Sequence, residues 1–392
     1  MIHNHDYDIA VCGGGFGGIS AALAAARGGK RVILFEKEYM LGGLGTAGLV
    51  TIYLPLCDGM GHQVSFGIAE ELFRLSITYG AEARYPENWL DGVGSRTEND
   101  KRFLVQYNAQ VFAILAEKLL EANGIDIMYG TYVVDTEVED GKITALYTEN
   151  KSGRTAYHIK GVIDATGDAD VAFSSGAPTK NFSYGNVLAA WYYFTDNEGY
   201  KLKQLGASDI SDEERAKAKN RQKPLSDRRF TGLDAKEISE FVKLSHEKTL
   251  EHWLEARKTN ENAVISTIAT IPQLRMTRRI VGEYELSKAD DHKYFDDSIG
   301  MVGDWRRRGP VYEVPFTTLY SSKIKNLAMA GRCISNTDDM WDIMRVIPCC
   351  AVTGEASGTA LSLSYDLTEL DVSKLQQTLV QNKVKLHEKD IL

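Results

Sequence analysis

The N-terminal part of the chain places a helical pattern between two short apolar runs. Ile9–Cys12 and Val32–Phe35 are continuous apolar segments, which is typical of buried parallel strands. An Ala-rich segment that starts at Phe16 lies between them and has the composition of a helix. This order predicts a strand–helix–strand unit, the building block of doubly wound α/β folds.

A glycine-rich turn joins the first strand to this helix. Gly13 allows a tight turn, Gly15 lets the backbone approach a pyrophosphate, and Gly18 lets the helix pack closely on the strand. Phosphates would then bind over the free N–H groups of the first helical turn, at Phe16. Glu36 follows the second strand, 21 residues after Gly15, where its carboxylate can accept ribose hydroxyls and would repel a 2′-phosphate. The spacing predicts a dinucleotide site that does not take NADP.

The segment after Glu36 distinguishes FAD from NAD. It reads Lys37-Glu38-Tyr39-Met40-Leu41 and continues with Gly42 and Gly43. Here the chain resembles the FAD-dependent oxidoreductases of the glutathione-reductase-like superfamily, in which a glycine pair lets a loop run beside the FAD. Taken alone, the pair is equally consistent with an ordinary turn. The resemblance implies FAD as cofactor, with Lys37, Gly42 and Gly43 in its site.

The segments that follow extend the α/β pattern. We expect helices from Gly67, over Tyr107–Asn123 and from Asp371, a polar loop over 82–101, and strands over 125–129, 131–135 and 143–147. Glu139-Asp140-Gly141-Lys142 has the Asp-Gly signal of a hairpin turn. The resemblance adds Val133, in the second of these strands, to the cofactor-binding residues.

Two later segments carry the same resemblance. The apolar run Gly161–Asp164 ends in Ala165-Thr166-Gly167-Asp168, and in the superfamily the backbone of such a strand end lies near the FAD. The second segment combines a short strand that ends in Gly331 and Arg332, then Arg345, and then a small-residue helix with Thr353 and Gly354. The resemblance implies that Gly331 and Arg332 cover the ribityl chain and that the helix N-terminus points at the flavin ring. Its dipole would stabilise negative charge there.

The segment between these markers has a different character, which predicts an insertion. It holds strand patterns over 187–194 and 264–271, and helical patterns over 211–222 and 233–258. We therefore expect a Rossmann-type FAD-binding domain over 1–177 and 326–365, an inserted substrate domain of strands plus helices over 178–325, and a C-terminal helix over 366–392. Segments 272–284, 312–316 and 331–358 resemble a bacterial family of stand-alone FAD-dependent oxidoreductases, whose substrates are varied and largely unassigned.

Composition narrows the class of protein. The net charge is −9, from 45 basic and 54 acidic residues, which argues against a nucleic-acid partner. The sequence has no apolar run long enough for a membrane span, and its N-terminus leaves no room for a signal peptide. Five cysteines without a CxxC pair indicate a reducing, cytoplasmic location and argue against a dithiol reductase. We expect no metal, and a homo-oligomer is possible.

A flavin enzyme that exchanges a hydride with its substrate needs a base and groups that orient the substrate. His62, in a glycine-rich loop, is the best candidate for the base, and Tyr312 is a weaker one. Arg275 and Arg278 have the chemistry to bind a carboxylate or phosphate. The alternatives are a structural histidine and structural ion pairs. We expect an FAD-dependent oxidoreductase acting on a small polar substrate, neutral or anionic; the other hypotheses are an NAD(P)H-fed flavin monooxygenase and a non-catalytic flavin-binding subunit.

Overall fold

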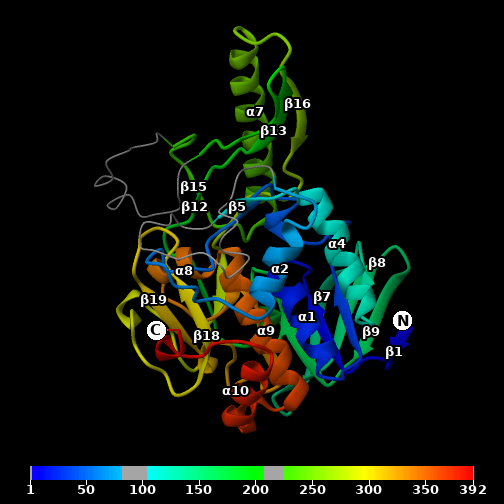
Figure 1. The fold of residues 1–392 in the computed structure, drawn as a ribbon. Coiled ribbons are helices and arrows are strands. Elements are labelled where there is room, and N and C mark those ends of the chain that lie inside the picture. The colour runs from blue at the N-terminus through cyan, green and yellow to red at the C-terminus, as the bar shows by residue number, and fades with distance from the viewer. Residues whose placement is uncertain (1, 82–103, 207–223, 392) are drawn as a thin grey trace. The chain divides into compact units, whose positions relative to one another are not determined.

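The computed structural model describes residues 2–81, 104–206 and 224–391, which form two compact units (Figure 1). The large unit consists of residues 1–46, 51–180 and 278–392, and the small unit of residues 47–50 and 181–277. Residues 278–325, which the sequence pattern assigned to the insertion, therefore belong to the large unit. The expected loop over 82–101 and the expected helix over 211–222 lie outside the described residues.

A parallel sheet of five strands forms the centre of the large unit. Its strand order is β20 (Leu327–Met329), β10 (Gly161–Asp164), β2 (Ile9–Cys12), β3 (Val32–Phe35) and β6 (Asp126–Met128). β2, β3 and β10 are buried at every position, which explains why their sequences are continuous apolar runs. The predicted α/β fold with a Rossmann-type sheet is confirmed, and the return segment supplies the edge strand beside β10.

Two helices of small residues pack against each other in the large unit. α1 (Phe16–Arg27) and α9 (Ile347–Leu363) lie side by side, as the blue and orange helices of Figure 1 show. A Cβ at Gly354 would lie only 2.2 Å from the carbonyl oxygen of Gly17, and one at Gly358 only 2.2 Å from that of Ala21. Glycine at both positions is therefore what allows the two backbones to approach this closely.

The large unit also contains a second sheet and a hairpin. The sheet has the order β1 (Ile2–Asn4), β9 (Gly153–His158), β8 (Lys142–Asn150) and β7 (Tyr132–Glu139), and the hairpin consists of β18 (Ser298–Gly303) and β19 (Val311–Pro315). Asp140 and Gly141 join β7 to β8 with φ of +50° and +74°, which confirms the predicted Asp-Gly turn.

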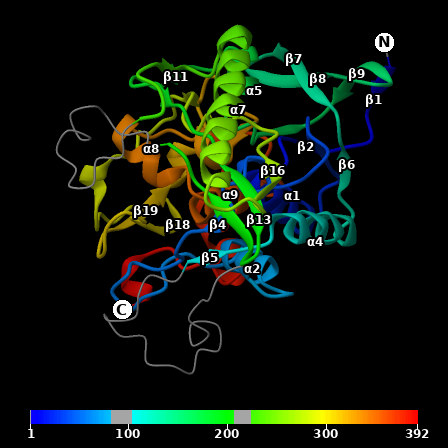
Figure 2. The same cartoon turned by 90° about the horizontal axis from the view of Figure 1, so that it is seen from above.

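The remaining elements of the large unit are short strands and helices. They are α2 (Ile68–Ser76), α4 (Ala109–Ala122), α5 (Asp170–Ser174), α8 (Asp338–Met344), α10 (Val372–Gln381), β4 (Ile52–Tyr53), β5 (Val105–Gln106), β11 (Thr179–Asn181, which ends in the small unit) and β17 (Arg278–Ile280). α4, which confirms the helix expected over 107–123, packs beside β6 at the end of the parallel sheet (Figure 2). Asp371 caps α10 by accepting from the Lys374 N–H at 3.3 Å.

In its described residues, the small unit contains a three-stranded sheet, a strand pair and one long helix. The sheet has the order β14 (Gly199–Lys203), β13 (Tyr192–Asp196) and β16 (Val264–Ile268); β12 (Asn186–Val187) pairs with β15 (Arg229–Phe230), and α7 spans Ala235–Arg257. The continuous strand expected over 187–194 was wrong. It is interrupted because the Ala190 N–H bonds to the Leu205 carbonyl and the Ser245 hydroxyl bonds to the Ala189 carbonyl.

Candidate functional site

The turn between β2 and α1, together with the start of α1, contains two glycines that the fold requires, Gly13 and Gly18, and one that it does not require, Gly15. Gly13 has φ +107°, and a Cβ at Gly18 would lie 1.9 Å from the Gly13 carbonyl oxygen. Gly15, by contrast, has an ordinary φ of −69°, and a Cβ there would meet no atom of the described chain within 4 Å. The N-terminus of α1 therefore borders open space at Gly15, where a ligand can approach the backbone.

The backbone at the start of α1 has the geometry of an anion site. The first intrahelical bond runs from the Ile19 N–H to the Gly15 carbonyl, 2.9 Å, so the N–H groups of Phe16, Gly17 and Gly18 precede it. The Phe16 side chain is buried and stacks on Phe112 at 4.5 Å between ring centroids. At Phe16 a pyrophosphate could therefore reach the backbone rather than the ring.

Glu36 is fixed at the end of β3. One carboxylate oxygen accepts from the Gly14 N–H at 2.7 Å, and the other from the Glu38 N–H at 2.8 Å. Burial raises the pKa of Glu36, although these two N–H donors act in the opposite direction. Each oxygen has further lone pairs, so the carboxylate could still accept ribose hydroxyls. Lys37, the next residue, is exposed.

The predicted glycine pair lies against the turn between β2 and α1. The Gly42 N–H donates to the Gly14 carbonyl at 2.8 Å, and Gly42 and Gly43 have φ of +103° and +55°. A Cβ at Gly43 would lie 3.3 Å from the Gly15 Cα. The loop therefore borders the same open space as the α1 N-terminus, where it could run beside a bound cofactor.

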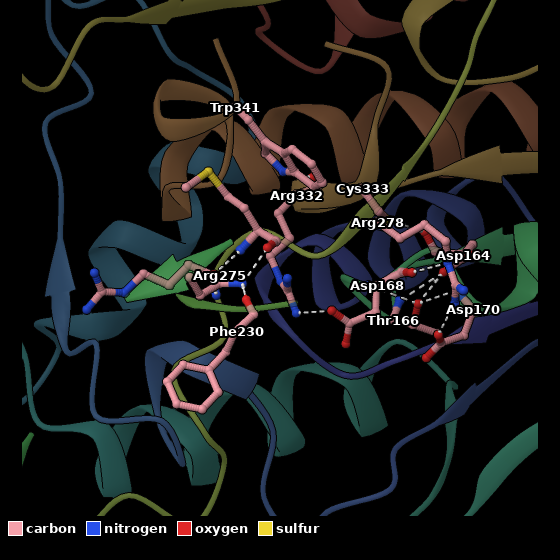
Figure 3. Close-up of polar contacts among 12 residues, drawn as sticks. Asp164, Thr166, Asp168, Asp170, Phe230, Arg275, Arg278, Arg332, Cys333 and Trp341 are labelled. Carbon is pink, nitrogen blue, oxygen red and sulfur yellow. Dashed lines mark hydrogen bonds and ion pairs between the residues drawn. The ribbon is translucent and has the colours of Figure 1, made fainter. Parts of the chain in front are cut away.

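The turn after β10 is joined to the return segment by an ion pair (Figure 3). Arg332 Nη2 lies 2.7 Å from Asp168 Oδ1, and a Cβ at Gly167 would lie 2.6 Å from Arg332 Nε. At the start of the turn, the Ala165 N–H donates to the Cys12 carbonyl at 2.9 Å. The structure thus brings together three segments that the sequence analysis linked only by resemblance.

Asp164, which the sequence analysis did not single out, holds this turn from inside. Its buried carboxylate accepts from the Thr166 N–H at 3.1 Å, the Thr166 hydroxyl at 2.7 Å and the Ala172 N–H at 2.9 Å. Burial raises the pKa of Asp164 to about 6. An acid at the end of an apolar strand, followed by Thr, was the available sequence signal for this turn.

Other predicted cofactor residues make contacts within the protein. The Thr353 hydroxyl accepts from the Gly331 N–H at 3.0 Å, and Gly354 faces α1 as described above. Arg345, which immediately precedes the N-cap of α9, pairs with the buried Asp342. Val133 lies partly buried in β7. Contact of these residues with the cofactor stays a prediction.

His62 has a buried partner that the sequence analysis missed. Its Nδ1 lies 2.9 Å from Asp58 Oδ2, and the two side chains are 42% and 7% exposed. Asp58 Oδ1 also accepts from the backbone N–H groups of Met60, at 2.7 Å, and His62, at 3.1 Å. The carboxylate therefore shapes the loop and orients the imidazole, and an Asp four residues before the His in a glycine-rich loop was the signal for it.

Two other catalytic candidates, Arg278 and Tyr312, have surroundings that differ from those of His62. Arg278 donates from Nε to the Asp168 carbonyl at 3.0 Å, pairs with Asp170 at 2.7 Å and lies over the Phe173 ring at 4.1 Å. These contacts favour the structural ion pair over substrate binding. Tyr312 is fully buried in β19, where burial raises the pKa of its hydroxyl.

Arg275 belongs to the small unit, whereas the other catalytic candidates belong to the large unit. Its Nη2 donates to Gln273 Oε1 at 2.7 Å, and its guanidinium lies 5.4 Å from the centroid of the Trp191 ring. Arg275 itself is almost fully buried. Its surroundings are therefore those of a fixed cation inside the small unit.

Neither the cysteines nor a cluster of metal-binding side chains forms a further candidate site among the described residues. All five cysteines are free, and no group of three or more His, Cys, Asp or Glu among the described residues could hold a metal ion. Within the same residues, no single helix is long and apolar enough to cross a membrane; α8 and α9 pass that test only together, and they meet at 90°.

Comparisons with known proteins identify the family of the chain. No match is found among curated proteins. Three similar solved structures are a geranylgeranyl bacteriochlorophyll reductase-like protein from Thermoplasma acidophilum (14% identity, 97% of this chain, 84% of that chain, TM-score 0.45), a p-nitrophenol 4-monooxygenase from Pseudomonas putida (12%, 97%, 82%, 0.47) and a myxobacterial chondrochloren halogenase (15%, 97%, 78%, 0.44). Such distant likenesses carry no argument about activity. A family model, FAD dependent oxidoreductase, matches residues 8–187 and 193–382, so the chain belongs to this family and is an FAD-dependent enzyme.

Proposed function

We propose that this enzyme exchanges a hydride between FAD and a small polar substrate, neutral or anionic, with His62 as the base. The observation that supports this most directly is the pair formed by His62 and Asp58. In this arrangement Asp58 accepts the Nδ1–H, which leaves the Nε2 lone pair to take a proton from an O–H or N–H group of the substrate. A buried carboxylate that orients a partly exposed imidazole is the usual arrangement for such a base.

The chain has suitable groups to hold the cofactor. Gly15 and the N-terminus of α1 would hold the pyrophosphate, and Glu36 the ribose; the open space beside Gly15 is the observation that fits a bound dinucleotide. Once bound, FAD supplies the hydride acceptor or donor. The positive end of the α9 dipole would favour negative charge near Arg345.

The small unit is our candidate for the substrate-binding domain. It carries Arg275, a buried cation whose guanidinium lies over Trp191 and adds a fixed positive charge to this unit. We also infer a place within the glutathione-reductase-like superfamily, in its bacterial branch, from the glycine pair and the turn at Asp168. A cytoplasmic location fits the five free thiols.

The test is a panel of small polar substrates scored by flavin bleaching without oxygen. We expect His62→Gln to lower the rate of bleaching by roughly 10²- to 10⁴-fold, with the FAD content unchanged. His5→Gln, a change at an exposed histidine in the N-terminal segment, is the control and should retain the wild-type rate. A wild-type rate in His62→Gln would exclude His62 as the base.

Two other results would favour the alternative functions. NADPH oxidation coupled to hydroxylation of the substrate would indicate a flavin monooxygenase. A flavin that is bleached by no substrate, together with unchanged photoreduction in His62→Gln, Arg275→Gln and Arg278→Gln, would favour a flavin-binding subunit. The first of these results would retain the FAD site and replace the hydride-transfer proposal.

A further inference from the structure

The outer face of α7 carries a regular stripe of exposed side chains. Lys243, Glu247, Leu250, Leu254 and Arg257 follow each other at alternating intervals of four and three residues, and all five are exposed. This spacing keeps the five side chains on one side of an α-helix. The two leucines at the centre of the stripe are each 51% exposed.

The opposite face of the same helix packs inside the small unit. Phe241 and Thr249 are its buried positions, and Phe241 belongs to the apolar core with Phe230. At 100° per residue, Leu250 and Leu254 project about 180° and 220° away from Phe241. The leucines therefore contribute nothing to this core, and the fold of the small unit does not explain their presence.

The charges along the stripe complement the same charges on a second, antiparallel copy of the helix. Glu247 lies three residues before Leu250, and Arg257 lies three residues after Leu254. When a second copy of the helix is laid antiparallel so that Leu250 meets Leu254, Glu247 meets Arg257. A two-fold axis beside residue 252 thus pairs Glu247 and Arg257, the two charges of the stripe that lie within the overlap of the helices, with a charge of opposite sign.

We propose that two copies of this chain associate through α7, in an antiparallel pair centred between Leu250 and Leu254. A two-fold interface uses the same patch on both subunits and so requires a self-complementary pattern, whereas a different protein would not require it. The heptad-like spacing and the charged positions that flank the leucines are those of a helix–helix seam. The charges set the register and the direction of the pair.

The size of this contact makes the association reversible. The two helices overlap over residues 247–257, which is about three turns on each side. Such an overlap is smaller than the interface of a permanent dimer, which buries about 2,000 Å² or more. We therefore expect a monomer–dimer equilibrium that depends on protein concentration and weakens as salt screens the charge pairs.

Sedimentation velocity of the full-length FAD-bound protein, over a wide range of concentration, tests this proposal. We expect Leu250→Asp with Leu254→Asp to raise the dimer dissociation constant by more than tenfold. Ile114→Asp with Val380→Asp is the matched control, because these side chains are 56% and 53% exposed on α4 and α10. The control should leave the equilibrium unchanged.

Charge reversal tests the register without altering the leucines. Glu247→Arg alone and Arg257→Glu alone each oppose like charges and should weaken the dimer by about tenfold, whereas the two together restore the pairing and should restore the dimer. Circular dichroism and thermal melting confirm that each variant is folded. A wild-type protein that stays monomeric at every concentration overturns the proposal. A dimer that survives the leucine changes, or a double reversal that binds no better than the single ones, also overturns it.

Discussion

Replacing Gly15 or Gly18 by alanine tests whether the glycine-rich turn has a cofactor-binding role distinct from its folding role. A Cβ at Gly18 would lie 1.9 Å from the Gly13 carbonyl oxygen, a backbone atom that cannot move without shifting β2. A Cβ at Gly15 would meet no atom of the described chain within 4 Å. We therefore expect the two substitutions to act on different properties of the enzyme.

The expected free energies follow from these distances. Overpacking at Gly18 should cost about 1–3 kcal/mol of unfolding free energy or more, which exceeds the gain of up to about 1 kcal/mol in helix propensity. At Gly15, the loss of a glycine N-cap and the lower entropy of the unfolded chain are of similar size and opposite sign, so stability should change by less than about 1 kcal/mol. If the Cβ displaces the pyrophosphate from one backbone N–H, FAD affinity should fall by roughly 10- to 150-fold, because a hydrogen bond to a charged group is worth about 1.5–3 kcal/mol.

Two measurements on the FAD-free protein check both expectations. Chemical denaturation gives the unfolding free energy, and quenching of flavin fluorescence on titration gives the FAD dissociation constant. Gly15→Ala should be as stable as the wild type and bind FAD weakly, whereas Gly18→Ala should be clearly less stable. Wild-type FAD affinity in Gly15→Ala would show that the pyrophosphate does not lie over Gly15. Wild-type stability in Gly18→Ala would refute the packing argument.

Three further predictions concern buried carboxylates. Burial raises the pKa of Glu355 to about 8, so the folded state holds a proton that the unfolded state releases near pH 4.5. The resulting contribution to the unfolding free energy is fully present at low pH. It is lost at about 1.4 kcal/mol per pH unit as the pH rises from about 4.5 to 8. Glu355→Gln should flatten this part of the stability profile in denaturation series, and an unchanged slope would contradict it. Asp342→Ala removes the buried carboxylate that pairs with Arg306 and Arg345. It should lower the unfolding free energy by about 3 kcal/mol in the same assay. A change below about 1 kcal/mol would refute the importance of this pairing. Asp58→Asn should retain FAD but lower the rate of flavin bleaching by about tenfold or more. It would also raise the KM for the substrate if the loop moves. An unchanged rate would contradict the orienting role of Asp58.

The parallel sheet was accessible from sequence because three of its strands are buried on both faces. β2, β3 and β10 appear as continuous apolar runs, and many of the turns between elements carry glycine at positive φ, as Gly13 and Gly141 do. The end of the insertion was not accessible, because the strands that continue after Thr277 look like those before it. The pattern of residues 278–325 does not reveal that their neighbours are in the large unit, since this depends on contacts distant in sequence.

The candidate site was predictable only in its local parts. Gly15 and Glu36 belong to one contiguous motif with fixed spacing, and the structure keeps them at the carboxyl ends of β2 and β3. The orienting role of Asp58 depends on how a loop closes, and the Asp168–Arg332 pair joins residues 164 positions apart. The Asp168–Arg332 pair is set by tertiary packing, and periodicity in a single sequence carries no signal for it. The Asp58–His62 pair is local, and its only signal was an Asp four residues before the His.

The same packing makes the proposed cofactor site depend on the return segment. The N-terminus of α1 is held by α9, because the Gly17 carbonyl lies against Gly354, and by Gly331, whose backbone N would lie 2.9 Å from a Cβ at Gly17. The groups that would hold the pyrophosphate are therefore positioned by residues more than three hundred positions later in the chain. β2, α1 and β3 on their own contain the motif without the contacts that fix it. We therefore expect FAD binding to require the complete parallel sheet, with β20 in place beside β10, and not only the local motif.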